Sequence, residues 1–216
     1  MSTARQESTT PVLVGARASR TAQRMGRLWL RVFGWTVAGA LPACPSAVVI
    51  AAPHTTNWDL PFMLAVAYAL GVKPAWLGKR ELFRWPFGWF MRWLGGVPVD
   101  RSGRNDLVSQ VAERLRAGAR LFLVVPPSGT RRRAEYWKSG FYHIARGADV
   151  PIVCSYLDYA RKVGGIGLVL TPTGDVAADM DRIRECYAPI RGRYPEQMTP
   201  VRLREEDAPV SAAGGG

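Results

Sequence analysis

The sequence predicts an α/β fold: a single layered domain with a mixed, largely parallel central sheet, flanked by helices and preceded by an amphipathic N-terminal helix. Two short apolar runs, at 47–52 and 121–125, predict buried strands, and the second is unbroken enough to be covered on both faces. Helical stretches at 60–70 and 106–117 alternate with the strands, as in layered α/β domains. A length of 216 residues with 48% apolar residues suffices for the core of one domain.

The N-terminal part of the chain is polar and then amphipathic. We expect residues 1–24 to form a flexible basic tail, because they are rich in Ser, Thr and Arg and lack the apolar core of a secretory signal. Residues 25–41 carry Trp, Leu and Phe beside Arg27 and Arg31, and they predict the amphipathic helix. This stretch is too interrupted to span a membrane, so it lies either on a membrane surface or against the core.

A polar loop between the 47–52 strand and the 60–70 helix holds the first candidate site. His54, one of only two histidines, lies five positions before Asp59. On a straight helix these side chains would point roughly 140° apart, so they meet only if His54 lies on the loop and Asp59 in the first turn. An imidazole held by a carboxylate acts as a general base. The simpler alternative is that Asp59 caps the helix and His54 is an ordinary loop histidine.

Three tryptophans recur every fourth residue in the stretch 81–94, which follows a predicted short strand at 74–78. Helical spacing would align Trp85, Trp89 and Trp93 on one face, with Pro86 and Gly88 as the positions where the stretch could kink. Together with neighbouring arginines, this face predicts contact with a membrane, and core packing is the alternative. No nucleic-acid-binding motif accompanies the aromatic residues, so we expect no nucleic-acid partner.

Basic and hydroxyl side chains follow two further strands and form the phosphate-binding candidate. Arg101 lies in a turn after a short strand at 97–99, and the loop at 126–138 follows the strand at 121–125. Glycine lets the backbone approach an anion, hydroxyls and amides donate to it, and arginine binds phosphate through two hydrogen bonds. The alternative is a solvated basic loop. The candidate residues are Arg101, Ser128, Gly129, Thr130, Arg131 and Lys138.

The second half of the chain predicts the remaining elements of one domain, which we place at residues 25–204. His143 lies in a predicted helix and is expected to be structural. Residues 205–216 end in Ser-Ala-Ala-Gly-Gly-Gly and predict a flexible C-terminal tail. The elements are a helix at 139–146, strands at 151–157 and 163–170, and a closing helix at 176–190.

Charge and cysteine content narrow the possible partners. The net charge is +12, and residues 1–173 hold 23 Lys and Arg against 9 Asp and Glu. The excess of positive charge in residues 1–173 favours binding to an anionic membrane surface or to a phosphate-bearing substrate. The three cysteines and two histidines have no metal-ligand spacing, so we expect no metal, and the odd cysteine count suits reduced thiols in the cytosol.

Four sequence blocks in a fixed order resemble those of the glycerolipid acyltransferases, the lysophosphatidate acyltransferase-like family. The blocks are His54-x4-Asp59 after a strand, then 95–101, 125–131 and 150–153. The resemblance spans residues 47–157, and four blocks in order are more specific than any one of them. The third block departs from the family pattern, because Ser128 stands where the family usually has the glutamate of Pro-Glu-Gly-Thr-Arg.

The resemblance implies transfer of a fatty acyl group from an acyl thioester, acyl-CoA or acyl-carrier protein, to a hydroxyl of a lysophosphatidate- or lysophospholipid-like acceptor. His54 would be the general base and Asp59 would orient it, with no cofactor besides the donor substrate. Arg101 and the third block would hold the acceptor's phosphate, and the tryptophans would contact a membrane or the acyl chain. We expect a cytoplasmic protein that associates peripherally with the inner face of a membrane.

Two other functions fit parts of the sequence. Ser128, His54 and Asp59 could form the triad of a lipid esterase or thioesterase, although Ser128 lacks the Gly-x-Ser-x-Gly turn that exposes an activated serine. A non-catalytic peripheral protein would use the basic, Trp-rich surface to bind anionic lipid, but this function gives no reason for four ordered blocks.

Overall fold

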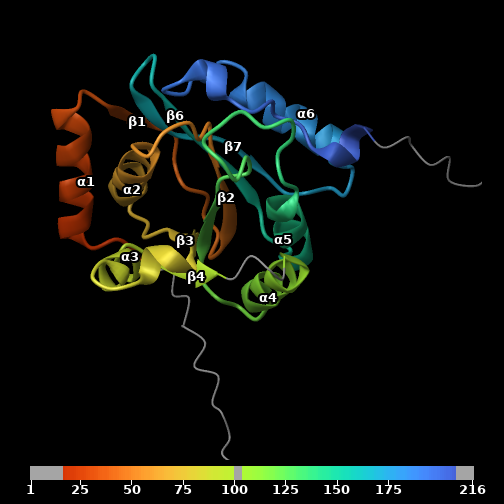
Figure 1. Ribbon diagram of the computed structural model, residues 1–216, viewed down its shortest axis with the longest axis horizontal. Coiled ribbons are helices and arrows are strands. Elements are labelled where there is room, and N and C mark those ends of the chain that lie inside the picture. The colour runs from red at the N-terminus through yellow and green to blue at the C-terminus, as the bar shows by residue number, and fades with distance from the viewer. Residues whose placement is uncertain (1–16, 100–103, 208–216) are drawn as a thin grey trace, which may run out of the picture.

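A seven-stranded sheet forms the centre of the computed structural model, which describes residues 17–99 and 104–207 (Figure 1). The strand order is β1-β7-β6-β2-β5-β3-β4, and all neighbours run parallel except the antiparallel pair β6 and β7. The predicted mixed, largely parallel sheet is therefore confirmed. The strands are β1 (Thr36–Ala38), β2 (Ala47–Ala52), β3 (Ala75–Lys79), β4 (Gly96–Val99), β5 (Phe122–Val125), β6 (Ile152–Asp158) and β7 (Val163–Leu170).

Helices cover both faces of the sheet. The α2 helix packs against one face with α1 alongside it, and α4, α5 and α6 cover the opposite face (Figure 1). The helices are α1 (Arg20–Val32), α2 (Asp59–Ala69), α3 (Gly88–Trp93), α4 (Arg104–Arg116), α5 (Gly140–Ala148) and α6 (Val176–Tyr187). Short 3-10 helices are η1 (Arg80–Phe83), η2 (Pro195–Gln197) and η3 (Arg204–Asp207).

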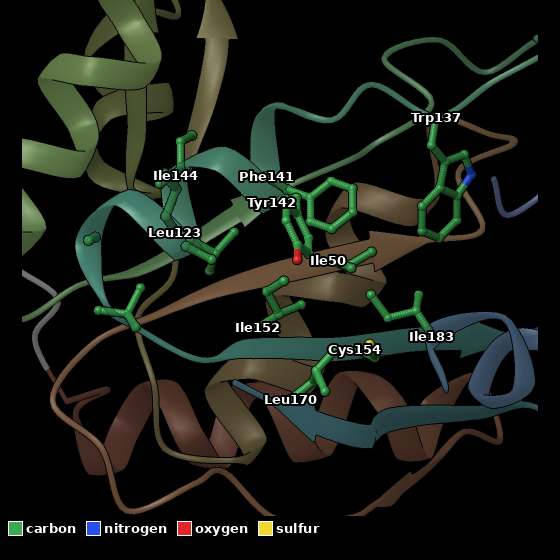
Figure 2. Packing of buried hydrophobic residues seen from close by; sticks show 14 of the residues in the cluster. Ile50, Leu123, Trp137, Phe141, Tyr142, Ile144, Ile152, Cys154, Leu170 and Ile183 are labelled. Carbon is green, nitrogen blue, oxygen red and sulfur yellow. The ribbon is translucent and has the colours of Figure 1, made fainter. Parts of the chain in front are cut away.

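The β2 strand lies between β6 and β5 and is buried on both faces. Its side chains alternate: Val48 and Ile50 pack under α4, α5 and α6, whereas Val49 faces α2. Figure 2 shows Phe141 of α5 and Ile183 of α6 on the first of these faces, near the strand residues. Full burial of each such side chain stabilises the fold by roughly 1.5–3 kcal/mol. A strand packed in this way gives a rigid support to the loop that follows it.

The N-terminal elements differ from the prediction. Helix α1 begins at Arg20, where the Ser19 side chain accepts a hydrogen bond from the Ala22 amide at 3.1 Å, and so it starts within the stretch expected to be a tail. The prediction of one helix over 25–41 is wrong beyond Val32, because Gly34 takes a φ of 71° and turns the chain into β1. This edge strand of only three residues pairs with β7.

Helix α1 packs with one face and exposes another. Gly26 allows close contact with α2, since a Cβ at this position would lie 2.7 Å from the Ala65 carbonyl oxygen. Leu30 is buried in the same contact. On the opposite side, Met25, Leu28 and Val32 are exposed to solvent. Packing against the core therefore describes one face of this helix, and contact of the exposed face with a membrane stays a prediction.

The tryptophan-rich stretch is not one helix. The chain forms η1, then a turn at Trp85, and only then the short helix α3, so the predicted single row of three indoles is wrong. Pro86 interrupts the helix. Gly88 is required there because a Cβ would lie 1.9 Å from the Phe83 carbonyl oxygen. The alternative of core packing is also wrong for these tryptophans, because Trp85, Trp89 and Trp93 are 93%, 70% and 59% exposed.

The other predicted elements are present with boundaries that move by a few residues. At the C-terminal side, η3 continues the described structure to Asp207, past the expected domain boundary at 204. An ion pair between Arg184 of α6 and Glu206 holds η3 against the domain.

Candidate active site

His54 and Asp59 form a hydrogen-bonded pair at the carboxyl end of β2. His54 lies on the loop that follows the strand, and Asp59 is the first residue of α2. Their side chains meet with 3.0 Å between His54 Nδ1 and Asp59 Oδ2, which confirms the predicted contact. A carboxylate acceptor assigns the ring proton to Nδ1 and leaves the lone pair on Nε2. This neutral tautomer is the one that can accept a proton from a substrate.

The Asp59 carboxylate is buried, with 5% of the residue exposed, and it accepts four hydrogen bonds. Its Oδ2 atom accepts from His54 and from the backbone amides of Thr55 and Thr56, at 2.8 and 3.0 Å. Its Oδ1 atom accepts from the hydroxyl of Tyr159 at 2.8 Å. The alternative of a simple helix cap is wrong, because the carboxylate bonds the loop before the helix. These contacts fix the loop and the orientation of the His54 ring together.

Tyr159 is a residue of this site that the sequence did not indicate. It follows β6 directly, and β6 runs parallel to β2, so both strands bring their carboxyl ends to the same edge. Burial, and then the charge and hydrogen bond of Asp59, raise the pKa of the Tyr159 hydroxyl well above its usual value. The hydroxyl therefore stays protonated and donates to the carboxylate. Only the order of the strands reveals this neighbour.

A cavity of about 1380 Å³ opens next to the His54–Asp59 pair. The lining side chains that come from α2 and from the sheet beneath it are mostly apolar, and we call this part of the lining the apolar arm. Its lining includes Val49, Leu60, Met63, Trp76, Val124 and Ile166. The other arm is polar and includes Asn57, Thr130, Arg131, Lys138, His143 and Arg204. His54 and Asp59 line the same cavity.

The loop after β5 brings most of the predicted phosphate-binding residues into this cavity. Gly129, Thr130, Arg131 and Lys138 all line it. Gly129 has a φ of 63°, which favours glycine, and a Cβ there would lie 2.4 Å from Lys138 Nζ. The Lys138 side chain thus lies directly against the glycine backbone. The structure brings these four residues together beside His54, as the sequence predicted.

Ser128 and Arg101 are the two candidates that are not among the described residues lining this cavity. Ser128 is buried, and its hydroxyl donates to the Thr130 carbonyl oxygen at 2.8 Å, so it closes the turn of the loop. Together with His54, it lines a small second pocket of about 20 Å³. Arg101 lies outside the described residues. The strand before it, β4, runs parallel to β3 and hence to β5 and β2, so its carboxyl end lies at the edge that carries His54.

The three tryptophans lie elsewhere. None of Trp85, Trp89 and Trp93 is among the described residues that line the cavity, although Glu81 and Leu82 of η1 are. Within residues 17–99 and 104–207, no helix is long and apolar enough to cross a membrane. In the same ranges no three His, Cys, Asp or Glu side chains cluster as metal ligands.

His143 is half-exposed at the start of α5, and its Nε2 lies 3.8 Å from Glu205 Oε1. Desolvation of Glu205 is outweighed by its hydrogen bonds and by His143, so the pKa of Glu205 is lowered. His143 lines the polar arm but has no contact with the His54–Asp59 pair among the described interactions.

Comparison with known proteins agrees with this geometry. A family model described as Acyltransferase matches residues 37–157, more than half of the chain. A 1-acyl-sn-glycerol-3-phosphate acyltransferase from Streptococcus pneumoniae is 31% identical over 109 residues, which are 49% of this chain and 39% of that relative. The match thus spans well under half of the relative's length.

A solved structure has the same fold. The 1-acyl-sn-glycerophosphate (LPA) acyltransferase PlsC from Thermotoga maritima superimposes with a TM-score of 0.58 at 18% identity, over 79% of this chain and 77% of that chain. At this identity the likeness concerns the fold, and the family model carries the assignment. The chain belongs to the acyltransferase family.

Proposed function

We propose that this protein transfers a fatty acyl group from an acyl thioester to a hydroxyl of a lysophospholipid-like acceptor. The observation that carries the proposal is the His54–Asp59 pair, 3.0 Å apart, beside a cavity whose lining is apolar in one part and polar and basic in another. Membership of the acyltransferase family supports it. The relative that matches over 109 residues is a 1-acyl-sn-glycerol-3-phosphate acyltransferase.

In the proposed reaction, His54 Nε2 takes the proton of the acceptor hydroxyl while that oxygen attacks the thioester carbonyl carbon. Asp59 stabilises the imidazolium that forms. The tetrahedral intermediate then collapses, the carbon–sulfur bond breaks, and the leaving thiolate receives the proton from His54. The acceptor oxygen is itself the nucleophile, so no acyl-enzyme forms. Holding donor and acceptor together supplies much of the rate enhancement.

The apolar arm suits the acyl chain. Each methylene group buried from water contributes about 0.8 kcal/mol, so a long acyl chain would gain most of its affinity in this apolar arm. Pockets for ligands of ordinary size hold about 300–1,000 Å³. The cavity here, at about 1380 Å³, has room for an acyl chain and part of an acceptor at the same time. The chain would enter between α2 and the sheet and leave its carbonyl carbon at His54.

The polar arm suits the phosphate of the acceptor. Arg131 and Lys138 supply positive charge, and Gly129 allows the backbone to approach an anion. Arg101, from the loop after β4, would join them. Ser128 replaces the carboxylate that the third block usually carries, and its hydroxyl serves the turn instead. The pocket therefore carries one negative charge fewer, which favours an anionic headgroup.

The donor is an acyl-CoA or an acyl-carrier protein, and no further cofactor takes part. The exposed tryptophans of the 85–93 segment and the exposed apolar side chains of α1 suit a membrane surface. Indoles favour headgroup depth, and the arginines beside them attract anionic lipid. We place the protein on the cytoplasmic face of a membrane, where both lipid substrates are available.

The alternatives receive less support. A Ser128-dependent hydrolase needs a serine hydroxyl aimed at His54, whereas this hydroxyl donates to the Thr130 carbonyl oxygen. A non-catalytic lipid-binding protein would have no use for a His54 ring held by a buried carboxylate that accepts four hydrogen bonds.

A donor-by-acceptor assay tests the proposal. Purified protein is incubated with acyl thioesters of several chain lengths, with and without lysophosphatidate or other lysophospholipids. We expect thiol release and acylated lipid in equal amounts, and only when an acceptor is present. Thioester hydrolysis without acceptor, together with fluorophosphonate labelling of Ser128, would establish the hydrolase instead.

A further inference from the structure

The hydroxyl of Tyr159 donates to Asp59 Oδ1 at 2.8 Å, on the side of the carboxylate opposite His54. An ionised carboxylate has about four acceptor positions. Here His54 and two backbone amides bond Oδ2, and among the described residues Tyr159 alone bonds Oδ1. Tyr159 is the only side chain among these donors besides His54, so it is the one that a substitution can remove.

The ring of Tyr159 is held firmly in place by its neighbours. It packs edge-on against Trp35 and Phe62, with ring centroids 4.9 and 6.1 Å apart. The guanidinium of Arg193 lies 5.9 Å from the ring centroid on another side. The Tyr159 amide also donates to the Arg191 carbonyl oxygen at 2.9 Å. A ring with so little freedom can aim its hydroxyl at a single acceptor.

We propose that Tyr159 is a positioning residue for the His54–Asp59 pair. This inference rests on the proposed function, which makes His54 the general base. The Tyr159 hydroxyl holds Oδ1 so that Oδ2 stays directed at His54 Nδ1, and it accepts part of the carboxylate's charge. Without it, the carboxylate turns more freely and concentrates its charge on the remaining donors.

The raised pKa of Tyr159 supports this role, because the hydroxyl stays a donor throughout the pH range in which the enzyme would work. Among the described residues, Arg193 and Tyr194 lie next to Tyr159. Besides the pair, the charged and titratable groups of the described cavity lining are Glu81, Arg131, Glu135, Tyr136, Lys138, His143, Tyr156, Arg204 and Glu205. A phenylalanine at position 159 leaves all of them in place. Any change in the pH dependence then comes from the lost hydroxyl.

The test is Tyr159→Phe, with Tyr68→Phe as the matched control. Tyr68 lies on the same helix as Asp59 and is not among the described residues that line the cavity. In Tyr159→Phe we expect kcat to fall about tenfold with KM within about twofold, because a hydrogen bond to a charged group is lost. The acid limb of the pH–rate profile should move to higher pH, since a less neutralised carboxylate favours the imidazolium. Tyr68→Phe should match the parent protein.

A second readout needs no substrate. The sequence has two histidines, so the Nδ1–H proton of His54 can be identified by NMR, with His143→Gln removing the other ring. The hydrogen bond to a buried carboxylate slows exchange of this proton. In Tyr159→Phe the resonance should shift and exchange faster, and in Tyr68→Phe it should not.

The outcomes separate the two proposals. An unchanged resonance, kcat and acid limb in Tyr159→Phe would overturn the positioning role even in a protein that transfers acyl groups. A lower unfolding temperature with the same resonance and acid limb would also overturn it, because the tyrosine would then serve stability alone. A resonance that responds in a protein inactive toward every acceptor supports the positioning role and contradicts the proposed reaction.

Discussion

Asp59 and His54 are five residues apart, and their side chains meet because α2 begins at Asp59 itself, immediately after the loop that carries His54. The carboxylate also accepts the amides of Thr55 and Thr56, so the same group that holds the ring also closes the loop. The folding of the loop and the proposed chemistry both depend on this one buried carboxylate. The substitutions below test its role and the roles of the residues around it.

Asp59→Asn should damage both stability and activity. The amide nitrogen would face donors where a carboxylate oxygen now accepts, which costs about 1–3 kcal/mol for an unsatisfied buried group. It would also favour the wrong ring tautomer of His54, and kcat should fall at least about a hundredfold. Urea unfolding and steady-state kinetics on the same preparation measure the two effects. A fully stable, fully active variant would show that the carboxylate does not hold His54.

Arg131→Ala should weaken the reaction of acceptors that carry a phosphate. A charge-assisted contact is worth roughly 1.5–3 kcal/mol, so kcat/KM should fall about tenfold to a hundredfold. A phosphate-free analogue should change little. Arg133→Ala is the matched control, since Arg133 is exposed and is not among the described lining residues. An equal loss on both acceptors would mean that Arg131 binds the donor or supports the fold. The same comparison with Arg101→Ala tests the predicted role of Arg101.

Met63→Trp should shorten the preferred acyl chain. Met63 lies on α2 and lines the apolar arm, so an indole at this position would fill part of the space for the acyl chain. Excluding two or three methylene groups at about 0.8 kcal/mol each should lower the ratio of kcat/KM for long over short donors about tenfold to fiftyfold. The short donor serves as the internal control. Equal losses on all chain lengths would place the acyl chain outside this arm.

Trp85→Ser combined with Trp89→Ser should weaken binding to anionic vesicles. Both side chains are exposed, so the fold should keep its unfolding temperature. Burying a large apolar side chain is worth roughly 1.5–3 kcal/mol, and the vesicle partition coefficient should therefore fall at least about tenfold. Sedimentation with vesicles of phosphatidylglycerol, and with neutral vesicles as the control, measures it. If the folded variant binds vesicles as well as the parent protein does, another surface of the protein contacts the membrane.

Local patterns predicted the centre of the site well. The apolar run at 47–52 predicted a strand before His54, and the helical stretch at 60–70 predicted a helix after it. The i,i+5 spacing required the geometry that the structure has. The glycine and basic residues of the 129–138 loop also lie where a parallel strand end would bring them.

What the sequence missed depends on contacts between distant segments. Tyr159 reaches Asp59 only because β6 is the neighbour of β2, and strand order is not visible in a periodic pattern. The three-residue strand β1 is too short to show alternation and exists by pairing with β7. The departure of Trp85 from the expected helix has a local cause instead, because Pro86 and the close contact of Gly88 with the Phe83 carbonyl oxygen override the four-residue spacing.

The most direct test of the account is the acyl-transfer rate of His54→Ala beside that of His143→Ala, the only other histidine in the sequence. Each variant is checked for folding by circular dichroism and thermal unfolding, then assayed with an acyl-CoA and a lysophospholipid. We predict that His54→Ala loses at least about a hundredfold in kcat, as expected for a missing general base, whereas His143→Ala loses no more than a few-fold. A well-folded His54→Ala protein that still transfers acyl groups at near the parent rate would contradict the central claim.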